Sequence, residues 1–381
     1  MSAYRSRAIN DLEAVLSEQN RSEIMTLKII SCNCIGGKLF SAASVVTQEM
    51  LSIFEDFPSE KSCTLAFEDV WDVRKLQDLV ELHSEKEWKE EVRAKKPKIS
   101  KSIQNNKDDA AFVNLENYIL DLDYHMSCMK KVIKNRKEER DLSKREVIKA
   151  LNVHLFSPLS GGNCVIDFHV MEEDNCVCSC GCTTPVHAGP TGIGVESCWH
   201  GFVDMVVSGN ELVNTVQTSD LSEKVKMVVG VKREENLLDS RFQSSVIAET
   251  ITNSFAQVNR NPAVSGLPIP AFGCTPDEIL VFAYDCRNDM LLKKMVDLKL
   301  FHDDVKSATI VMLWLYINFT SFMRRDVTDT LTKPFLSEFT SEFCSSRQIE
   351  SCYRKVTSAT PEFYPVSNWP KLNYYSSANM T

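Results

Sequence analysis

Three stretches decide the fold: ESCWHGFVDMVV (residues 196–207), KVKMVVGVKREE (224–235) and RFQSSVIAETITNSFAQ (241–257). The first two are rich in β-branched and aromatic residues, which is typical of strands. The third has apolar residues at helical spacing. We therefore predict strands over Trp199–Val207 and Val225–Lys232, followed at once by a helix over Ser240–Gln257.

The segments on either side of this centre predict a mixed α/β architecture. A helix is expected over Lys144–Leu155 and a first strand over Cys164–Met171. Glu278–Asp285 is nearly continuous in apolar residues, which is typical of a strand covered on both faces. A crossover helix should make this last strand parallel to its neighbour. We thus expect an α/β (or α+β) fold with a mixed central sheet in αβββαβ order and flanking helices.

Shifts in composition divide the chain into three parts. Residues 1–143 are predicted to be mainly helical, with a basic, polar loop at 93–107. Residues 144–325 form the α/β domain, which carries a cysteine-rich loop at 172–190. Residues 326–381 are predicted to be a C-terminal extension that wraps over the domain. Further helices are expected over Ala8–Ser17, Val70–Leu82, Ala111–Lys131 and Val305–Phe322.

The overall composition limits the class of protein and its partners. Of 381 residues, 43% are hydrophobic and 25% charged, which is typical of a soluble globular protein. The formal net charge of −9 means that nucleic acid, as a partner, would require a local basic surface. The most apolar run, Ala308–Ile317, is too short to span a bilayer, and the N-terminus lacks a secretory signal. We expect an intracellular protein, cytoplasmic or nuclear, with no membrane partner; the sequence leaves the oligomeric state open.

One aspartate and one lysine stand at chemically informative places on the two predicted strands. Asp204 lies within the first strand, and Lys232 ends the second, 28 residues later. Carboxylates hold Mg²⁺ or Mn²⁺ beside a phosphate, and a nearby cation steadies the attacking water. The pair therefore favours metal-dependent phosphodiester hydrolysis of nucleic acid as a first hypothesis.

The strings HGFVDMVV and VVGVKREE, with the helix that carries Gln243, resemble the PD-(D/E)XK nuclease superfamily of restriction-endonuclease-like folds. The resemblance covers about residues 144–290. It implies that Asp204 is a metal-binding aspartate, Lys232 the catalytic lysine and Gln243 the glutamine early on the following helix. It also implies that Glu146, on the helix before the strands, is an accessory acid.

The chain departs from that family at Gly230, where the second metal-binding acid is expected two residues before Lys232. Two acids are candidate replacements: Glu196, on the approach to Asp204, and Glu249, on the helix after Gln243. Glu234 and Glu235 are predicted to lie just beyond the strand. Without a replacement acid, the resemblance implies an inactive, nuclease-derived module that binds nucleic acid or another protein.

A run of alternating cysteines is the second unusual feature of the chain. It comprises Cys176, Cys178, Cys180 and Cys182, with His187 five residues later. Alternate residues of an extended chain lie about 7 Å apart, so these thiols need a bend to share one ion. Gly181 and Pro185 can supply it, although the spacing departs from the usual Cys-x2–4-Cys of zinc sites. A surface loop of reduced thiols, a Zn²⁺ or copper(I) clip and disulfides all remain open, and the clip gives a third hypothesis, a zinc-binding scaffold.

Overall fold

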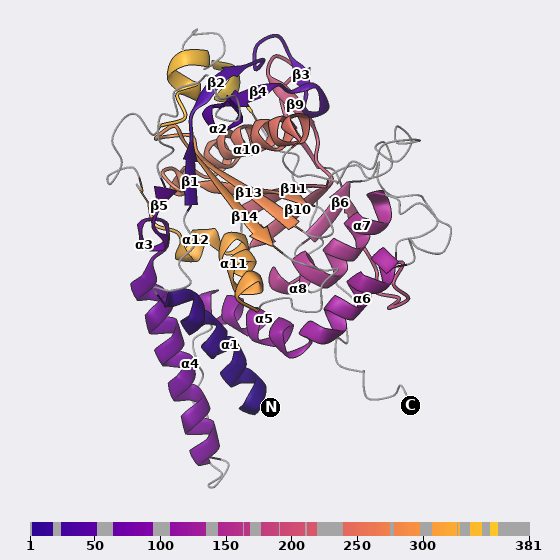
Figure 1. Ribbon diagram of the computed structural model, residues 1–381, viewed down its shortest axis with the longest axis vertical. Helices are drawn as coiled ribbons and strands as arrows, with labels where there is room; N and C mark the ends of the chain where they lie inside the picture. Colours follow the sequence, from indigo (N-terminus) through magenta and orange to yellow (C-terminus); the bar gives the residue numbers. More distant parts are fainter. Residues whose placement is uncertain are drawn as a thin grey trace.

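A nine-stranded mixed sheet runs through the computed structural model, with helices on both faces (Figure 1). The structure describes residues 2–17, 24–51, 64–93, 107–134, 144–162, 164–167, 177–189, 191–209, 212–218, 239–274, 278–297, 307–325, 327, 336–344 and 351–356. The strand order is β5-β1-β14-β13-β12-β11-β10-β6-β7. The strands are β1 (Ile24–Leu27), β5 (Thr64–Leu65), β6 (Cys164–Asp167), β7 (Ala188–Gly189), β10 (Met205–Gly209), β11 (Leu212–Thr218), β12 (Ile269–Cys274), β13 (Glu278–Asp285) and β14 (Met290–Asp297).

One long helix, α10 (Ser240–Arg260), covers one face of this sheet and is itself covered by two small sheets (Figure 1). These sheets are β2 (Ile29–Cys32) with β4 (Val45–Thr47), and β3 (Lys38–Leu39) with β9 (Trp199–Phe202) and β8 (Gly192–Gly194). The Asp239 carboxylate caps the helix by accepting a hydrogen bond from the Arg241 backbone N–H at 2.9 Å. Because α10 lies between two layers, its polar side chains are buried along with its apolar ones.

Most other helices pack against the opposite face of the nine-stranded sheet (Figure 1). They are α1 (Ser2–Leu16), α4 (Val73–Arg93), α5 (Lys107–Leu120), α6 (Leu122–Lys134), α7 (Lys144–Leu151), α8 (Ser157–Leu159) and α11 (Ser307–Ile317); short helices α2 (Gln48–Leu51), α3 (Phe67–Val70) and α12 (Phe319–Phe322) complete the fold.

Strand β13 is covered on both faces and shows that the large sheet has a hydrophobic core on each side. Its Ile279, Val281 and Ala283 face this helical layer, whereas Leu280, Phe282 and Tyr284 face α10. This two-sided burial is the reason for its continuous apolar run.

Large aromatic side chains fill the helical side of the core. Trp314 is fully buried, and its ring lies against Phe112 and Phe322 with centroids 6.2 and 4.9 Å away. Its indole N–H donates to the Ala111 carbonyl at 2.8 Å, so the one polar atom of the ring is satisfied. Burying such a side chain stabilises the fold by about 1.5–3 kcal/mol.

The predicted strand over Trp199–Val207 is wrong as a single strand. The chain forms β9 in a small sheet and then β10 in the large sheet, with a break at Val203 and Asp204. Gly201, within β9, has a φ of 146°, a backbone conformation that a side chain would strain. The apolar run continues across the break because both strands are partly buried.

The order of strands after β10 also differs from the prediction. The strand that pairs with β10 is the polar segment β11, and the predicted strand Val225–Lys232 lies outside the described residues. The helix α10 leads into β12, which is parallel to β11, so β13 is antiparallel to both its neighbours. Strand β12 contains Pro270 and Gly273, which are rare in central strands, and this composition concealed it.

The N-terminal part contributes strands as well as helices. Strands β1 and β5 extend the large sheet beyond β14. Residues before the expected boundary at 143 therefore belong to the same sheet as residues after it. The helix predicted over Ala111–Lys131 is two helices, α5 and α6, that meet at Asp121. The basic loop 93–107 lies, apart from its two end residues, outside the described part of the chain. Of the helices that the structure describes, none is long and apolar enough to cross a lipid bilayer.

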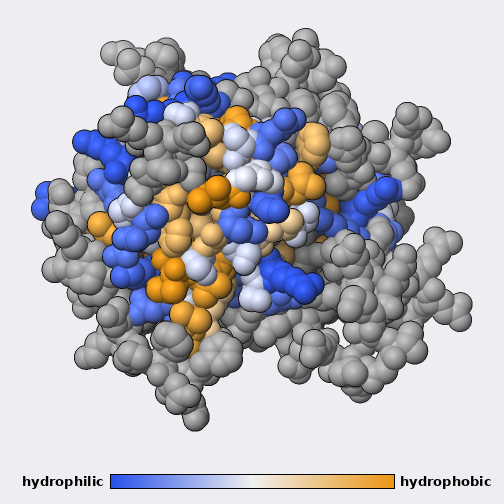
Figure 2. All heavy atoms as spheres, turned by 90° about the horizontal axis from the view of Figure 1, so that it is seen from above, coloured by the Kyte–Doolittle hydropathy of each residue, from blue (hydrophilic) through white to orange (hydrophobic). Residues whose placement is uncertain are grey.

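The described parts of the C-terminal extension pack on the side of α10. The Asn259 side-chain amide donates to the carbonyls of Tyr353 and Val356, and the Phe339 ring stacks on Trp199 at 5.6 Å. Viewed from this end of the molecule, apolar side chains gather among hydrophilic ones (Figure 2). The small sheets and the loop between them hold the exposed apolar side chains Ile30, Ile35, Leu39 and Phe202.

Candidate metal centre and acidic site

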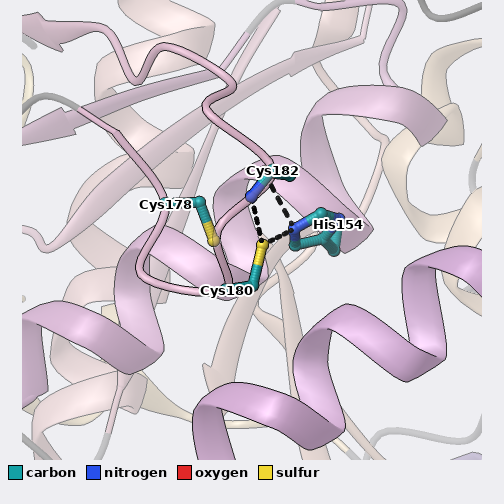
Figure 3. A group of neighbouring side chains, drawn as sticks. All are labelled: His154, Cys178, Cys180 and Cys182. Carbon is teal, nitrogen blue, oxygen red and sulfur yellow. Dashed lines mark hydrogen bonds between the residues drawn. The ribbon is translucent and has the colours of Figure 1, made fainter. Parts of the chain in front are cut away.

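Four side chains converge beside strand β6 in the arrangement of a metal centre (Figure 3). They are His154, Cys178, Cys180 and Cys182, whose ligand atoms all lie within 4.8 Å of one another. The His154 Nε2 atom is 3.1 Å from the Cys180 sulfur and 3.6 Å from the Cys182 sulfur. A tetrahedral zinc ion, with Zn–S of about 2.3 Å and Zn–N of about 2.0 Å, separates such atoms by about 3.5 Å. This group of four side chains can hold a metal ion.

The three cysteines come together because the loop folds back on itself. Val177 pairs with Pro185 in an antiparallel bridge, and the Cys178 N–H donates to the Thr184 carbonyl at 3.4 Å. Between them the chain turns sharply, with φ of 89° at Gly181 and 55° at Thr183. The turn gathers thiols that an extended chain would hold about 7 Å apart.

Hydrogen bonds within the loop favour a negative charge on one of its sulfur atoms, that of Cys182. A hydrogen bond from Cys178, with others from His154 and Thr184, lowers the pKa of the Cys182 thiol against the opposing effect of burial. Burial and the neighbouring Cys182 raise the pKa of Cys180, whose sulfur accepts the Cys182 backbone N–H at 3.3 Å. The Cys182 thiolate therefore accepts hydrogen bonds from neighbouring groups. A bound cation can take the place of those protons.

The fourth ligand comes from an irregular helix. His154 lies in a π-helical turn, Asn152–Phe156, that continues α7, and such turns are frequent at functional sites. Its backbone carbonyl accepts a hydrogen bond from the Tyr118 hydroxyl at 2.8 Å. Its Nδ1 atom lies 3.2 Å from Nδ1 of His125, and burial, with the charge of His154, lowers the pKa of His125 to about 3. A neutral His125 can accept the Nδ1 proton of His154, which leaves Nε2 free to bind a metal.

The centre differs from the predicted cysteine set at both ends. Cys176 lies outside the described residues. His187 is not one of the four ligands, because it stands before β7 and its carbonyl accepts the Ile166 N–H in the edge pairing of β6. His154 takes its place from a helix 24 residues before Cys178. It was missed because a buried histidine among apolar helix residues is indistinguishable in sequence from an ordinary core residue.

The structure brings Asp204, just before β10, close to Glu249 of α10. The Lys144 ammonium of α7 lies 3.0 Å from one Asp204 carboxylate oxygen. Glu249 is only 1% exposed, and its Oε2 atom accepts no hydrogen bond from the described residues. Burial and the charge of Asp204 raise the pKa of Glu249 well above its usual value, while Lys144 lowers it. Glu249 is therefore close to Asp204, and both its burial and this neighbouring charge favour its protonated form.

A third acid stands opposite Asp204 in the sheet. Asp167, the last residue of β6, donates its backbone N–H to the Asp204 carbonyl at 3.0 Å. Both residues are at most 9% exposed. Asp167 is thus joined to Asp204 through the backbone, and Lys144 contacts the Asp204 carboxylate.

The remaining predicted site residues lie elsewhere. Gln243 accepts a hydrogen bond at 3.4 Å from Lys293, whose ammonium also pairs with Glu49 at 2.5 Å, so it belongs to a separate contact between α10 and β14. Glu196 is exposed in the turn between β8 and β9, away from the large sheet.

Three further predicted positions bear on the acidic site. Glu146 is on α7 two residues after Lys144, and it is Lys144 that forms the ion pair with Asp204. Lys232, Gly230 and the acids Glu234 and Glu235 lie outside the described residues. Among the described residues, Lys144 therefore holds the position beside the carboxylates that was expected of Lys232.

Comparisons with models of known protein families, with curated proteins and with solved structures find no match to this chain. The resemblance to the PD-(D/E)XK superfamily therefore rests on the quoted sequence strings.

Proposed function

We propose that this protein binds Zn²⁺ through His154, Cys178, Cys180 and Cys182, and that the ion fastens the cysteine loop to the helical layer beside β6. The observation that carries the proposal is the convergence of four ligand atoms within 4.8 Å. Three soft sulfur ligands and one imidazole match zinc and do not match Mg²⁺ or Ca²⁺, which prefer oxygen. Four protein ligands leave no open position, so the role is structural rather than catalytic.

Metal analysis of the purified full chain tests this proposal. We expect zinc in the wild-type protein and the loss of one equivalent in the double variant Cys178→Ser/Cys180→Ser. Cys286→Ser is the matched control, because Cys286 is a half-buried thiol outside the centre. A double variant that keeps the full zinc content of the wild type would sink the proposal.

A second candidate function is metal-dependent phosphodiester hydrolysis by a nuclease-like α/β domain. The proximity of Asp204, Glu249 and Lys144 supports it, since Glu249 is a second acid near Asp204 and could replace the missing strand acid. The sequence of elements α7, β6, β10, β11, α10 and β12 is further support. In it, β6, β10 and β11 form an antiparallel meander and β12 is parallel to β11.

In this second proposal the residues have distinct roles. Asp204 and Glu249 would hold Mg²⁺ or Mn²⁺, which would supply Lewis-acid chemistry when bound. Glu249 would lose its proton on binding a cation, because the positive charge of the cation stabilises the ionised carboxylate. Lys144 steadies negative charge beside the carboxylates.

A cleavage assay on DNA and RNA with Mg²⁺ or Mn²⁺ tests the second proposal. We expect cleavage by the wild type and its loss in Asp204→Asn and Glu249→Gln, with Glu146→Gln as the control on the adjacent helix. Lys232→Ala tests the lysine that the sequence predicted. Salt-sensitive binding without cleavage would instead favour the inactive, nuclease-derived binding module.

A further inference from the structure

The metal centre is open to solvent on the side of two of its cysteines. Cys180 and Cys182 are partly exposed, whereas Cys178 is only 2% exposed. The residues beside and between the two open cysteines are exposed: Ser179, Gly181 and Thr183. A small solute can therefore reach this part of the loop from solution.

The sulfur atoms of the centre lie close enough to react with one another. Its ligand atoms, the three sulfurs included, all lie within 4.8 Å of one another (Figure 3). The two sulfurs of a disulfide are about 2.05 Å apart. A movement of about 3 Å or less therefore brings any two of the three to the bonded distance.

One of the open cysteines has the charge state of a nucleophile. Hydrogen bonds from Cys178, and then from His154 and Thr184, lower the pKa of the Cys182 thiol. Burial instead raises the pKa of the core thiols Cys164 and Cys274. Because the thiolate is the form that oxidants attack, and only where they can reach it, oxidation selects the open loop over the core.

We propose that the cysteine loop is a peroxide-sensitive site, at which oxidation of Cys182 to a disulfide with Cys178 or Cys180 releases the bound zinc. This inference rests on the proposed zinc centre, because the oxidised sulfurs are ligands of that ion. The oxidant is hydrogen peroxide, which is small enough to enter the loop and accepts two electrons. The loop is thus a modification site as well as a metal site.

The oxidation takes place in two steps. In the first, the Cys182 thiolate attacks one oxygen of hydrogen peroxide: an S–O bond forms, the O–O bond breaks and hydroxide leaves, so that Cys182 becomes a sulfenic acid. In the second, the thiolate of Cys178 or Cys180 attacks the Cys182 sulfur: the S–S bond forms, the S–O bond breaks and a second hydroxide leaves. Two thiolates lose one electron each, and one peroxide is reduced to two hydroxide ions.

The disulfide removes two of the four ligands, because a metal binds the thiolate and not the disulfide. His154 and one cysteine remain, and two ligands do not complete a tetrahedral zinc site. The loop therefore releases the ion and loses its attachment to the π-helical turn that carries His154. A thiol reductant reverses the change, because thiol–disulfide exchange restores both thiols.

Peroxide treatment of the reduced, zinc-loaded full chain tests the inference. We expect one zinc ion per chain to pass to a zinc-binding dye, together with a mass loss of two hydrogen atoms and a disulfide that peptide mapping places between Cys182 and Cys178 or Cys180. Thiol reductant with added zinc should restore the bound ion. Cys286→Ser is the matched control, because Cys286 is a half-buried thiol outside the centre, and it should release zinc as the wild type does.

A variant with an altered ligand separates the oxidation from the loss of the site. Cys182→His keeps four ligands, two sulfurs and two imidazoles, and such a set also binds zinc. We expect this variant to retain zinc and to release it several-fold more slowly in peroxide, because it lacks the reactive thiolate.

Failure of this inference is distinct from failure of the zinc centre. A reduced chain that holds no zinc overturns both. Zinc that stays bound in excess peroxide, or zinc that leaves without a disulfide in the loop, overturns the peroxide-sensitive site alone. Release from Cys182→His at the rate of the wild type also overturns it.

Discussion

The Nε2 atom of His154 lies 3.6 Å from the sulfur of Cys182, the separation that two corners of a tetrahedral zinc site require. The histidine comes from a helix and the cysteine from a loop after the next strand, so the contact joins two layers of the fold. An ion at this point would link the cysteine loop to the helices beside β6.

Removal of zinc should destabilise the protein. An ion that binds the folded chain at 1,000 times its Kd stabilises it by about 4 kcal/mol, and a chelator withdraws that contribution. We expect a lower Tm with a zinc chelator in the wild type. Thermal unfolding of Cys178→Ser/Cys180→Ser should show no response to the chelator, and a persisting response would locate zinc elsewhere.

Loss of the His125 imidazole should weaken zinc binding without removing a ligand. His125 meets Nδ1 of His154 at 3.2 Å and so orients the ring. Removal of such an outer partner typically costs about 10–100-fold in metal affinity. Competition with a zinc-binding dye should show this loss in His125→Ala and near-normal affinity in Tyr124→Phe, which keeps the ring beside His154. Equal affinities in the two variants would mean that His125 does not act on the ligand.

The Glu249→Gln variant should change how stability depends on pH. Burial and Asp204 raise the pKa of Glu249 above its usual value of 4.5, so the folded chain binds this proton more tightly than the unfolded chain. The resulting stability is fully present below about pH 4.5 and is lost as pH rises through the raised pKa. Denaturant unfolding should show Glu249→Gln gaining stability relative to wild type from pH 5 to pH 8. Parallel pH profiles for the two proteins would contradict the burial of a neutral acid; Glu146→Gln is the control.

Removal of Lys144 should leave Asp204 without its cation. A hydrogen bond to a charged group contributes about 1.5–3 kcal/mol, and the side chain of Lys144 is only 29% exposed, so we expect a loss near the lower end of that range in Lys144→Ala. The exposed Lys131→Ala should leave the free energy of unfolding nearly unchanged. A double-mutant cycle with Asp204→Asn isolates the pair, and a coupling energy of zero would show that the ion pair does not form in solution.

Elements with a regular pattern of apolar residues were predicted from the sequence, whereas elements with an irregular composition were missed. The strand Glu278–Asp285 has the predicted bounds because two covered faces demand an unbroken apolar run. Strand β12 was missed because Pro270 and Gly273 interrupt the pattern, although the sheet holds it in a central position. Local patterns also cannot show that β9 and β10 belong to different sheets, because that follows from long-range pairing.

The candidate sites show the same division. The loop cysteines Cys178, Cys180 and Cys182 were predicted because their spacing is unusual in one short segment. Their partner His154 was not, since tertiary folding alone brings it near. Glu249 was considered as a substitute acid on the helix, and the structure places it beside Asp204, whereas no sequence signal distinguished Lys144 from the other lysines of its charged segment.

The most direct test of the central claim is a crystal of the zinc-loaded chain, measured on both sides of the zinc absorption edge. We predict an anomalous peak among the four side chains, about 2.3 Å from the sulfurs of Cys178, Cys180 and Cys182 and about 2.0 Å from His154 Nε2. A map with no peak at that position, or a disulfide between two of the three cysteines, would contradict the zinc centre.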